Sequence, residues 1–150
     1  MMGLALVVLG GLASADTLRI TGEQVHTVSG ETIDNGAVLV EDGRIVAVGA
    51  DAQVPRPEGA RQLSGAVVTP GLIDGWATAG LTGPHNHTPD QDHAERDQPV
   101  RPELRALDAW HPRDPLLGWI RGFGVTTVHA GPSPGQPVSG RTLVVSNRVA

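Results

Sequence analysis

The residues best suited to metal chemistry are gathered in one short stretch of the chain. His85 and His87 stand at alternate positions, and Asp90, Asp92 and His93 follow closely. Imidazole and carboxylate groups bind zinc and similar ions, but a closed zinc site takes three or four such ligands. Glycine, proline and threonine surround the two histidines, which indicates a loop without fixed alternation of side chains. The sequence therefore favours a solvated polar loop here, with a metal site as the alternative.

Two further polar side chains stand at the ends of predicted strands. Asp74 closes an apolar run, and His129 closes the β-rich run Val125–His129. Asp74 either anchors the loop backbone or faces a pocket, and His129 either bonds a neighbouring carbonyl group or points into a site. His26 and His111 have no partners nearby in the sequence, so we expect both to be structural or solvated. Cysteine is absent, which excludes disulfides and thiolate metal sites.

Short strands joined by tight turns are predicted between Asp16 and Pro70. The strongest pattern is a hairpin in which Ala37–Glu41 and Arg44–Gly49 flank Asp42-Gly43, a pair that tolerates the positive φ of a two-residue turn. Other turn signals are Thr21-Gly22, Asp34-Asn35-Gly36 and Ser64-Gly65. They divide the rest of the segment into the predicted strands Leu18–Ile20, Gln24–Val28, Arg61–Leu63 and Ala66–Val68. We expect this small β-layer to be a structural platform.

A strand–helix–strand order is predicted in the second half of the chain. Asp114-Pro115 is a helix start, because a carboxylate caps free amides and proline suits the first turn. Apolar residues then recur at helical spacing on one face that we expect to lie in the core, namely Leu116, Leu117, Ile120 and Phe123. Glycine ends this helix before the strand Val125–His129, and Thr142–Ser146 predicts a further strand. This order is typical of a parallel sheet.

The overall charge argues against a polyanionic partner such as nucleic acid. The formal net charge is −5, and no run of basic residues could follow a phosphate backbone. We therefore expect a small-molecule substrate or ligand instead of nucleic acid, with an oligomer or a paired homologue as a further possibility.

The N-terminus has the pattern of an export signal. Gly3–Leu12 is an apolar stretch too short to span a bilayer, and Ala13-Ser14-Ala15 has the small-x-small form that signal peptidases cleave. We therefore expect residues 1–15 to be a signal peptide, with no membrane span after its removal and a secreted or periplasmic protein. A buried strand or helix is the alternative.

Two segments resemble a known superfamily. The string AVVTPGLID at 66–74 is similar to the segment by which amidohydrolase-superfamily enzymes pass from an N-terminal β-sandwich into the first strand of a (β/α)8 barrel. The run GAVLVEDGRIVAVG at 36–49 resembles the sandwich hairpin of the same superfamily. A later stretch, 102–128, resembles the first loop, first helix and second strand of its imidazolonepropionase-like branch. The resemblance implies an α/β fold, with 16–66 as a β-sandwich portion and 67–150 as the start of an incomplete (β/α)8 barrel.

The resemblance also implies a hydrolase of non-peptide carbon–nitrogen bonds that uses zinc or another divalent metal. In the resembled enzymes, two alternating histidines at the end of the first barrel strand hold a metal that lowers the pKa of the attacking water. Here Asp74 is followed by Gly75-Trp76-Ala77, so this ligand pair is absent and no metal ligand is assigned. Asp74 and His129, at the ends of the first and second barrel strands, are the residues expected to face a substrate pocket.

Chain length limits what these residues do alone. A complete barrel takes roughly 250 residues, so we expect a 150-residue chain to be an inactive N-terminal fragment. Two hypotheses follow for the parent protein. It either hydrolyses an amide or cyclic amide with a rearranged or single-metal site, or it is a non-catalytic relative that binds a ligand or pairs with an active homologue. The sequence does not separate them.

Overall fold

The computed structural model describes residues 16–83, 85, 87–94 and 97–148. The predicted signal peptide, residues 1–15, lies outside the described residues. The chain divides into two compact units, the first ending at Pro70 and the second beginning at Gly71. In the described part of the chain, no helix has the length and apolar character needed to cross a membrane.

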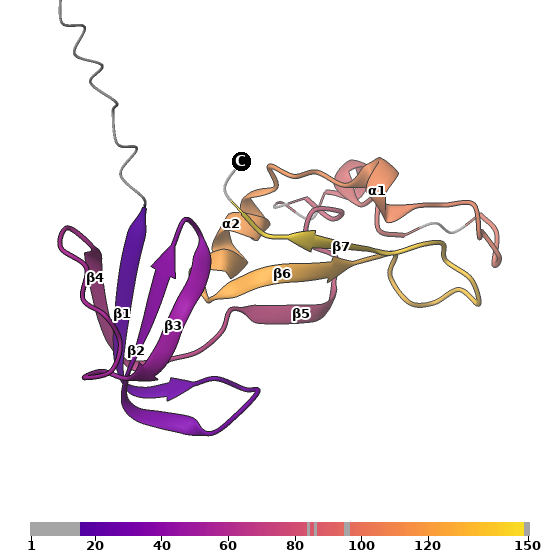
Figure 1. Cartoon of the computed structure of the whole chain (residues 1–150). Coiled ribbons are helices and arrows are strands. Elements are labelled where there is room, and N and C mark those ends of the chain that lie inside the picture. Colours follow the sequence, from indigo (N-terminus) through magenta and orange to yellow (C-terminus); the bar gives the residue numbers. More distant parts are fainter. Residues whose placement is uncertain (1–15, 84, 86, 95–96, 149–150) are drawn as a thin grey trace, which may run out of the picture. The chain divides into compact units, whose positions relative to one another are not determined.

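The first unit is one mixed four-stranded sheet. Its strands are β1 (Thr17–His26), β2 (Thr32–Glu41), β3 (Arg44–Ala50) and β4 (Arg61–Val68), in the order β3-β2-β1-β4 (Figure 1). The predicted hairpin is confirmed between β2 and β3, with positive φ at Asp42 (49°) and Gly43 (74°). Ala37, Leu39 and Val54 are buried together on this sheet. The expected β-sandwich portion therefore takes the form of a single sheet in the described residues.

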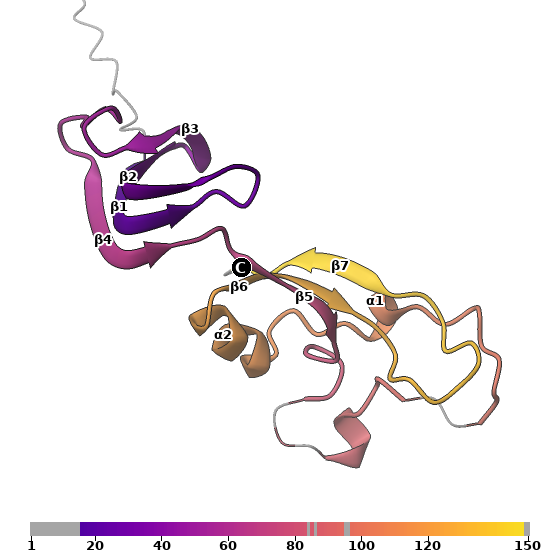
Figure 2. The same cartoon turned by 90° about the horizontal axis from the view of Figure 1, so that it is seen from below.

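A row of glycines crosses three neighbouring strands of this sheet. Gly22 on β1 is paired with Gly36 on β2 and with Gly65 on β4. The turns predicted at these three positions were wrong, because β1, β2 and β4 each continue through their glycine. Figure 2 shows β4 changing direction along its length instead of ending. At Gly36 and Gly22, neighbouring side chains lie too close to the backbone to leave room for a Cβ. A Cβ at Gly36 would lie 2.7 Å from Cγ2 of Val25, and one at Gly22 would lie 2.8 Å from Cγ2 of Val68.

The second unit is built on a three-stranded sheet with short helices. Its strands are β5 (Leu72–Ala77), β6 (Val125–Ala130) and β7 (Leu143–Ser146), in the order β5-β6-β7. β5 and β6 are parallel, and β7 is antiparallel to β6. The helical elements are η1 (Thr88–Asp90), α1 (Ala106–Ala109) and α2 (Pro115–Gly122). The predicted strand–helix–strand order of β5, α2 and β6 is confirmed, whereas a closed barrel is not formed by these three strands.

The core of the second unit lies between the sheet and α2. Its buried members are Ala77, Leu81, Ala106, Leu117, Val128 and Ala130. The predicted cap is confirmed, since Asp114 is buried and its Oδ1 accepts a 2.9 Å hydrogen bond from the Leu116 amide. The prediction that Phe123 lies in the core was wrong. Phe123 is 67% exposed and packs edge-on against Trp119, because α2 ends at Gly122 and the backbone of Phe123 has left the helical geometry.

Candidate functional site

The parallel strands β5 and β6 end at the same edge of their sheet, where loops gather functional groups in α/β folds. Asp74 lies in the middle of β5, three residues before its last residue, Ala77, and is half-buried. Its Oδ1 accepts a hydrogen bond of 3.1 Å from the Trp76 amide. The carboxylate therefore anchors the backbone of the strand end in this structure.

His129 joins the ends of all three strands. Its Nδ1 lies 2.9 Å from the Gly75 carbonyl oxygen, and its Nε2 lies 2.8 Å from Oγ1 of Thr142. A carbonyl oxygen only accepts hydrogen bonds, so Nδ1 carries the proton and, in the neutral ring, Nε2 accepts from the Thr142 hydroxyl. The Trp76 ring packs edge-on against the imidazole at a centroid distance of 5.8 Å. A role for Asp74 and His129 in a substrate pocket stays a prediction.

The end of β5 does not fit a metal. Gly75 and Ala77 offer no ligating atom, and both nitrogens of His129 already bond protein groups. His85 and His87 lie with their rings 6.0 Å apart, while Asn86 between them is outside the described residues. Within the described ranges, no three His, Cys, Asp or Glu side chains are close enough together to hold a metal ion.

The loops that follow β5 and β6 are fastened together by main-chain hydrogen bonds. The Ser133 amide donates to the His93 carbonyl (2.7 Å), and the Arg101 amide donates to the Val138 carbonyl (2.8 Å). Further along, the amides of Ala106 and Arg141 donate to the carbonyls of Arg141 and Leu104, respectively. These contacts span two short parallel bridges, Val100 with Val138 and Arg105 with Arg141. The space between the two loops is therefore fixed by backbone bonds and not only by side chains.

A cleft of about 360 Å³ lies between these fastened loops, and we name it the loop cleft. Asp92 and His93, both considered from the sequence, line it. Its other polar or charged lining residues are Gln91, Glu103, Arg105, Asp108 and Ser139. Sequence reasoning missed Glu103, Arg105, Asp108 and Ser139, because no local motif links them to His93. A neighbouring cleft of about 280 Å³ shares Leu81, Asp92 and Ala109 with it and is also lined by Asp90, His111 and Asp114.

The charged side chains at the loop cleft differ in their ion pairing. Arg101 binds Glu103, and this hydrogen bond lowers the pKa of the Glu103 carboxyl group. Arg105 and Asp108 form a looser ion pair at 3.7 Å. Asp92 makes no side-chain hydrogen bond or ion pair within the described residues. The Nδ1 atom of His93 is shielded from solvent and has no hydrogen-bond partner there.

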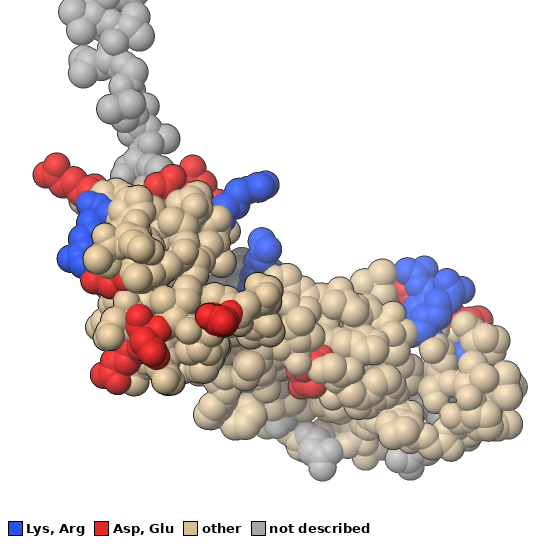
Figure 3. Space-filling view, turned by 60° about the horizontal axis from the view of Figure 1, so that its bottom comes forward, with Lys and Arg blue, Asp and Glu red and all other residues tan. Residues whose placement is uncertain are grey.

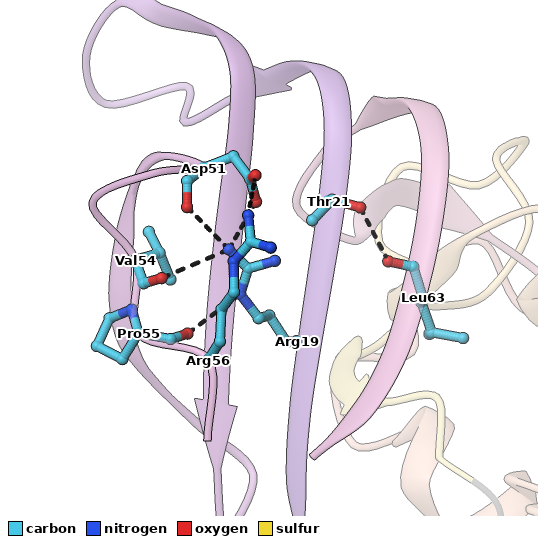
Figure 4. A network of polar contacts seen from close by, with 7 residues as sticks. All are labelled: Arg19, Thr21, Asp51, Val54, Pro55, Arg56 and Leu63. Atoms are coloured by element: carbon cyan, nitrogen blue, oxygen red, sulfur yellow. Dashed lines mark hydrogen bonds and ion pairs between the residues drawn. The ribbon is translucent and has the colours of Figure 1, made fainter. Parts of the chain in front are cut away.

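A second polar network lies on the sheet of the first unit (Figure 4). Arg19 is only 2% exposed, and its Nη2 donates to Oδ1 of Asp51 at 2.6 Å. It also donates to the carbonyl groups of Asp51, Val54 and Pro55, while Arg56 binds the other oxygen of Asp51. The hydrogen bond from Arg19 lowers the pKa of Asp51. These bonds tie the 51–56 loop to β1, and they satisfy a buried charge that would otherwise destabilise the sheet.

The surface charge is dispersed. On the face drawn in Figure 3, basic side chains occur in small groups with acidic side chains close by. An extended basic surface is therefore absent from this face of the described residues.

Known proteins resemble the chain in both sequence and fold. No protein-family model matches it. Over 89 residues it is 34% identical to an imidazolonepropionase of Geobacillus sp. (strain WCH70), a match that covers 55% of this chain and 18% of that protein. The crystal structure of an amidohydrolase from Thermotoga maritima MSB8 matches 88% of this chain with a TM-score of 0.75 and 25% identity. This chain is a relative of the amidohydrolase superfamily.

The amidohydrolase relationship extends over both units, since the structural match covers most of the chain. The chain spans only 18% of the imidazolonepropionase and 34% of the amidohydrolase that it matches. Within the described residues, the strand end at Gly75 contributes no metal ligand.

Proposed function

We propose that the full-length protein to which these residues belong is an amidohydrolase-type hydrolase of non-peptide carbon–nitrogen bonds, such as amides or cyclic amides. The observation that carries the proposal is the match in sequence to an imidazolonepropionase together with the match in fold to an amidohydrolase. The lack of ligands at the end of β5 means that any catalytic metal is held by groups other than those that follow Asp74. The site is accordingly a rearranged or single-metal one.

Metal analysis combined with an activity panel tests this proposal. The full-length protein is purified, analysed for bound divalent metal by inductively coupled plasma mass spectrometry and assayed against amides and cyclic amides. Turnover that a chelator abolishes and zinc restores is the expected result. Absence of metal together with absence of turnover across the panel would overturn the proposal.

A second candidate is a non-catalytic relative that binds a ligand or pairs with an active homologue. The geometry of His129 favours it, because a ring whose two nitrogens bond Gly75 and Thr142 is committed to holding the strand ends together. A ligand that raises the melting temperature without being turned over supports this candidate. Co-purification with a catalytically active homologue supports its pairing form.

We further propose that the protein is secreted or periplasmic. The apolar stretch and the Ala13-Ser14-Ala15 sequence support the proposal. N-terminal sequencing of protein recovered from the periplasm is expected to begin at Asp16. Recovery only from the cytoplasm, with Met1 or Met2 as the first residue, would contradict export.

A further inference from the structure

We propose that a polar hollow on the sheet of the first unit binds a small polar molecule that carries an oxyanion group, either a carboxylate or a phosphate. The hollow has a volume of about 600 Å³, and we name it the sheet hollow. Its lining residues come from β1, β2, β4 and the 51–56 loop. The proposal is independent of hydrolysis, because it requires only residues of the first unit.

The walls of the sheet hollow suit a polar ligand. All three glycines of the row that crosses β1, β2 and β4 line it, and glycine lets a ligand approach the backbone closely. Hydroxyl and amide side chains surround the glycines, from Thr21, Asn35, Gln62 and Ser64. The volume lies in the range of small-molecule pockets. An apolar ligand would leave these polar groups without hydrogen bonds, which disfavours its binding.

A nearly buried guanidinium group with unused donors supplies the independent observation. The side chain of Arg19, which lines the sheet hollow, is only 3% exposed. Its Nε donates to Pro55 and its Nη2 to Asp51 and Val54, whereas its Nη1 makes no hydrogen bond within the described part of the chain. Among the described side chains, the only nitrogen or oxygen atom both shielded from solvent and unpaired is Nδ1 of His93. The unpaired Nη1 of Arg19 is therefore open to a ligand.

A second guanidinium group lies beside the first. Arg56 also lines the sheet hollow and binds the second oxygen of Asp51. Figure 4 shows both guanidinium groups at Asp51, each with a nitrogen on the side away from the loop carbonyl groups. Two guanidinium groups share one carboxylate, which leaves one positive charge in excess. Glu23, the other acidic lining residue, is exposed, so solvent and salt screen its charge.

An oxyanion satisfies the donors that Asp51 leaves unused. Carboxylate and phosphate oxygens only accept hydrogen bonds at neutral pH, and their geometry matches the fork of a guanidinium group. A ligand with such a group would complete the hydrogen bonds of Arg19 Nη1 and add a bond from Arg56. A cation fits less well, because both oxygens of Asp51 are already bound and guanidinium groups offer no acceptor.

Calorimetric titration of the full-length protein with glycerol 3-phosphate and with glycerate tests the proposal, and glycerol is the neutral control. The buffer contains no phosphate and has low ionic strength, because salt screens the attraction. We expect the oxyanions to bind and glycerol not to bind. Binding of only one oxyanion supports the proposal and identifies the group that the site selects.

Substitution of Arg56 locates the binding. Arg56→Gln is expected to weaken oxyanion binding about tenfold, the loss of one charge-assisted hydrogen bond. The Arg56 side chain is 65% exposed, so the fold tolerates this change. Arg44→Gln is the matched control, because it removes the same charge from an exposed position of β3 that does not line the sheet hollow.

Nitrogen-15 NMR of Arg19 gives a second readout. Its Nε–H donates to the Pro55 carbonyl, which slows exchange of this proton with water. The Nε resonance, assigned with Arg19→Lys, is expected to shift when the oxyanion binds. Arg19→Lys keeps the charge but lacks Nη1, so it is expected to bind about tenfold more weakly, with circular dichroism as the test of its fold.

Three results would overturn the proposal. They are equal affinity of Arg56→Gln and Arg44→Gln for the oxyanion, glycerol binding as tightly as glycerate, and an Arg19 Nε resonance that stays unchanged at saturating oxyanion. The last result comes from the unsubstituted protein, so it decides the proposal even if Arg19→Lys does not fold.

Discussion

Asp114 is a buried carboxylate that serves two main-chain segments. Its Oδ1 caps α2 at Leu116, and its Oδ2 accepts a 2.8 Å hydrogen bond from the Gly80 amide in the loop after β5. A buried carboxylate in this position links the helix to the loop that lines both clefts. Removal of the Asp114 carboxylate leaves both amide donors without a partner. The expected loss of stability therefore exceeds that for removal of an ordinary helix cap.

Asp114→Ala is predicted to destabilise the second unit by about 2–4 kcal/mol, through loss of the cap and of the Gly80 bond. Urea unfolding followed by tryptophan fluorescence measures this unit alone, because Trp76, Trp110 and Trp119 all lie in it. Asp108→Ala is the control, with an expected loss of about 0.5 kcal/mol for an exposed ion pair. Equal effects of the two substitutions would contradict this assignment.

Asp51 makes the stability of the first unit sensitive to acid. The hydrogen bond from Arg19 holds the pKa of Asp51 below its ordinary value of 3.8. The stabilisation is therefore present above this unfolded-state value and is lost as the pH falls through the lower folded-state pKa. Asp51→Asn is predicted to weaken the protection of β1 and β2 amides from hydrogen exchange at neutral pH. It is also predicted to reduce the loss of this protection as the pH falls below about 4. Hydrogen–deuterium exchange measures both, and an unchanged acid profile would argue against the network.

The row of glycines at 22, 36 and 65 affects the course of three whole strands, β1, β2 and β4. Three sequence-distant glycines meet because β2 and β4 both pair with β1, and together they let three strands bend in step. A side chain is excluded at two of the three positions and tolerated at the third.

Gly36→Ala is predicted to destabilise the first unit by about 1–3 kcal/mol, because its Cβ would collide with Val25 and Ile33. Gly65→Ala, in the same row, meets only Val67 O at 3.7 Å and is expected to change stability by less than about 0.5 kcal/mol. Urea unfolding followed by circular dichroism compares the two variants. If Gly65→Ala lost as much stability as Gly36→Ala, glycine would be required for its backbone freedom and not for the close contact with neighbouring side chains.

The two loops of the candidate site depend on another glycine. Gly140 has a φ of 115°, and a Cβ there would lie 2.7 Å from the Leu104 carbonyl oxygen, the acceptor of the Arg141 amide. Gly140→Ala is predicted to speed hydrogen exchange at the Arg141 and Ala106 amides. Gly135→Ala is the matched control, since Gly135 also has positive φ but meets no atom within 4 Å. If both variants exchange alike, the contact with Leu104 is not what holds the loops.

At the scale of the whole molecule, exposed apolar strands favour self-association. Among the described residues, β5 pairs with β6 alone, and Ile73 (71%) and Trp76 (50%) are exposed on β5. Unpaired strand edges with apolar side chains template association. Ile73→Lys is predicted to lower concentration-dependent light scattering, whereas Ser29→Lys, an equal charge change on an exposed loop of the first unit, leaves it unchanged. Equal suppression by both variants would assign the effect to net charge.

The sequence by itself determined the features that neighbouring residues control. Asp42-Gly43 sets the turn of the β2–β3 hairpin through its own φ values, and Asp114-Pro115 starts α2 through a carboxylate two residues from the amide that it caps. The order of β5, α2 and β6 follows from periodicity within each segment. The amidohydrolase relationship followed from short strings of residues, and the comparisons bear it out.

Only the tertiary structure decided the features that join distant residues. The glycines at 22, 36 and 65 are turn signals when each is considered alone, and pairing across strands makes them a continuous bend. The loop cleft likewise gathers His93, Glu103 and Ser139 through backbone bonds between loops that no sequence pattern links. Local propensity is a weak term that cross-strand hydrogen bonds and packing override. For that reason the chemistry of this site depends on contacts that the folded chain alone creates.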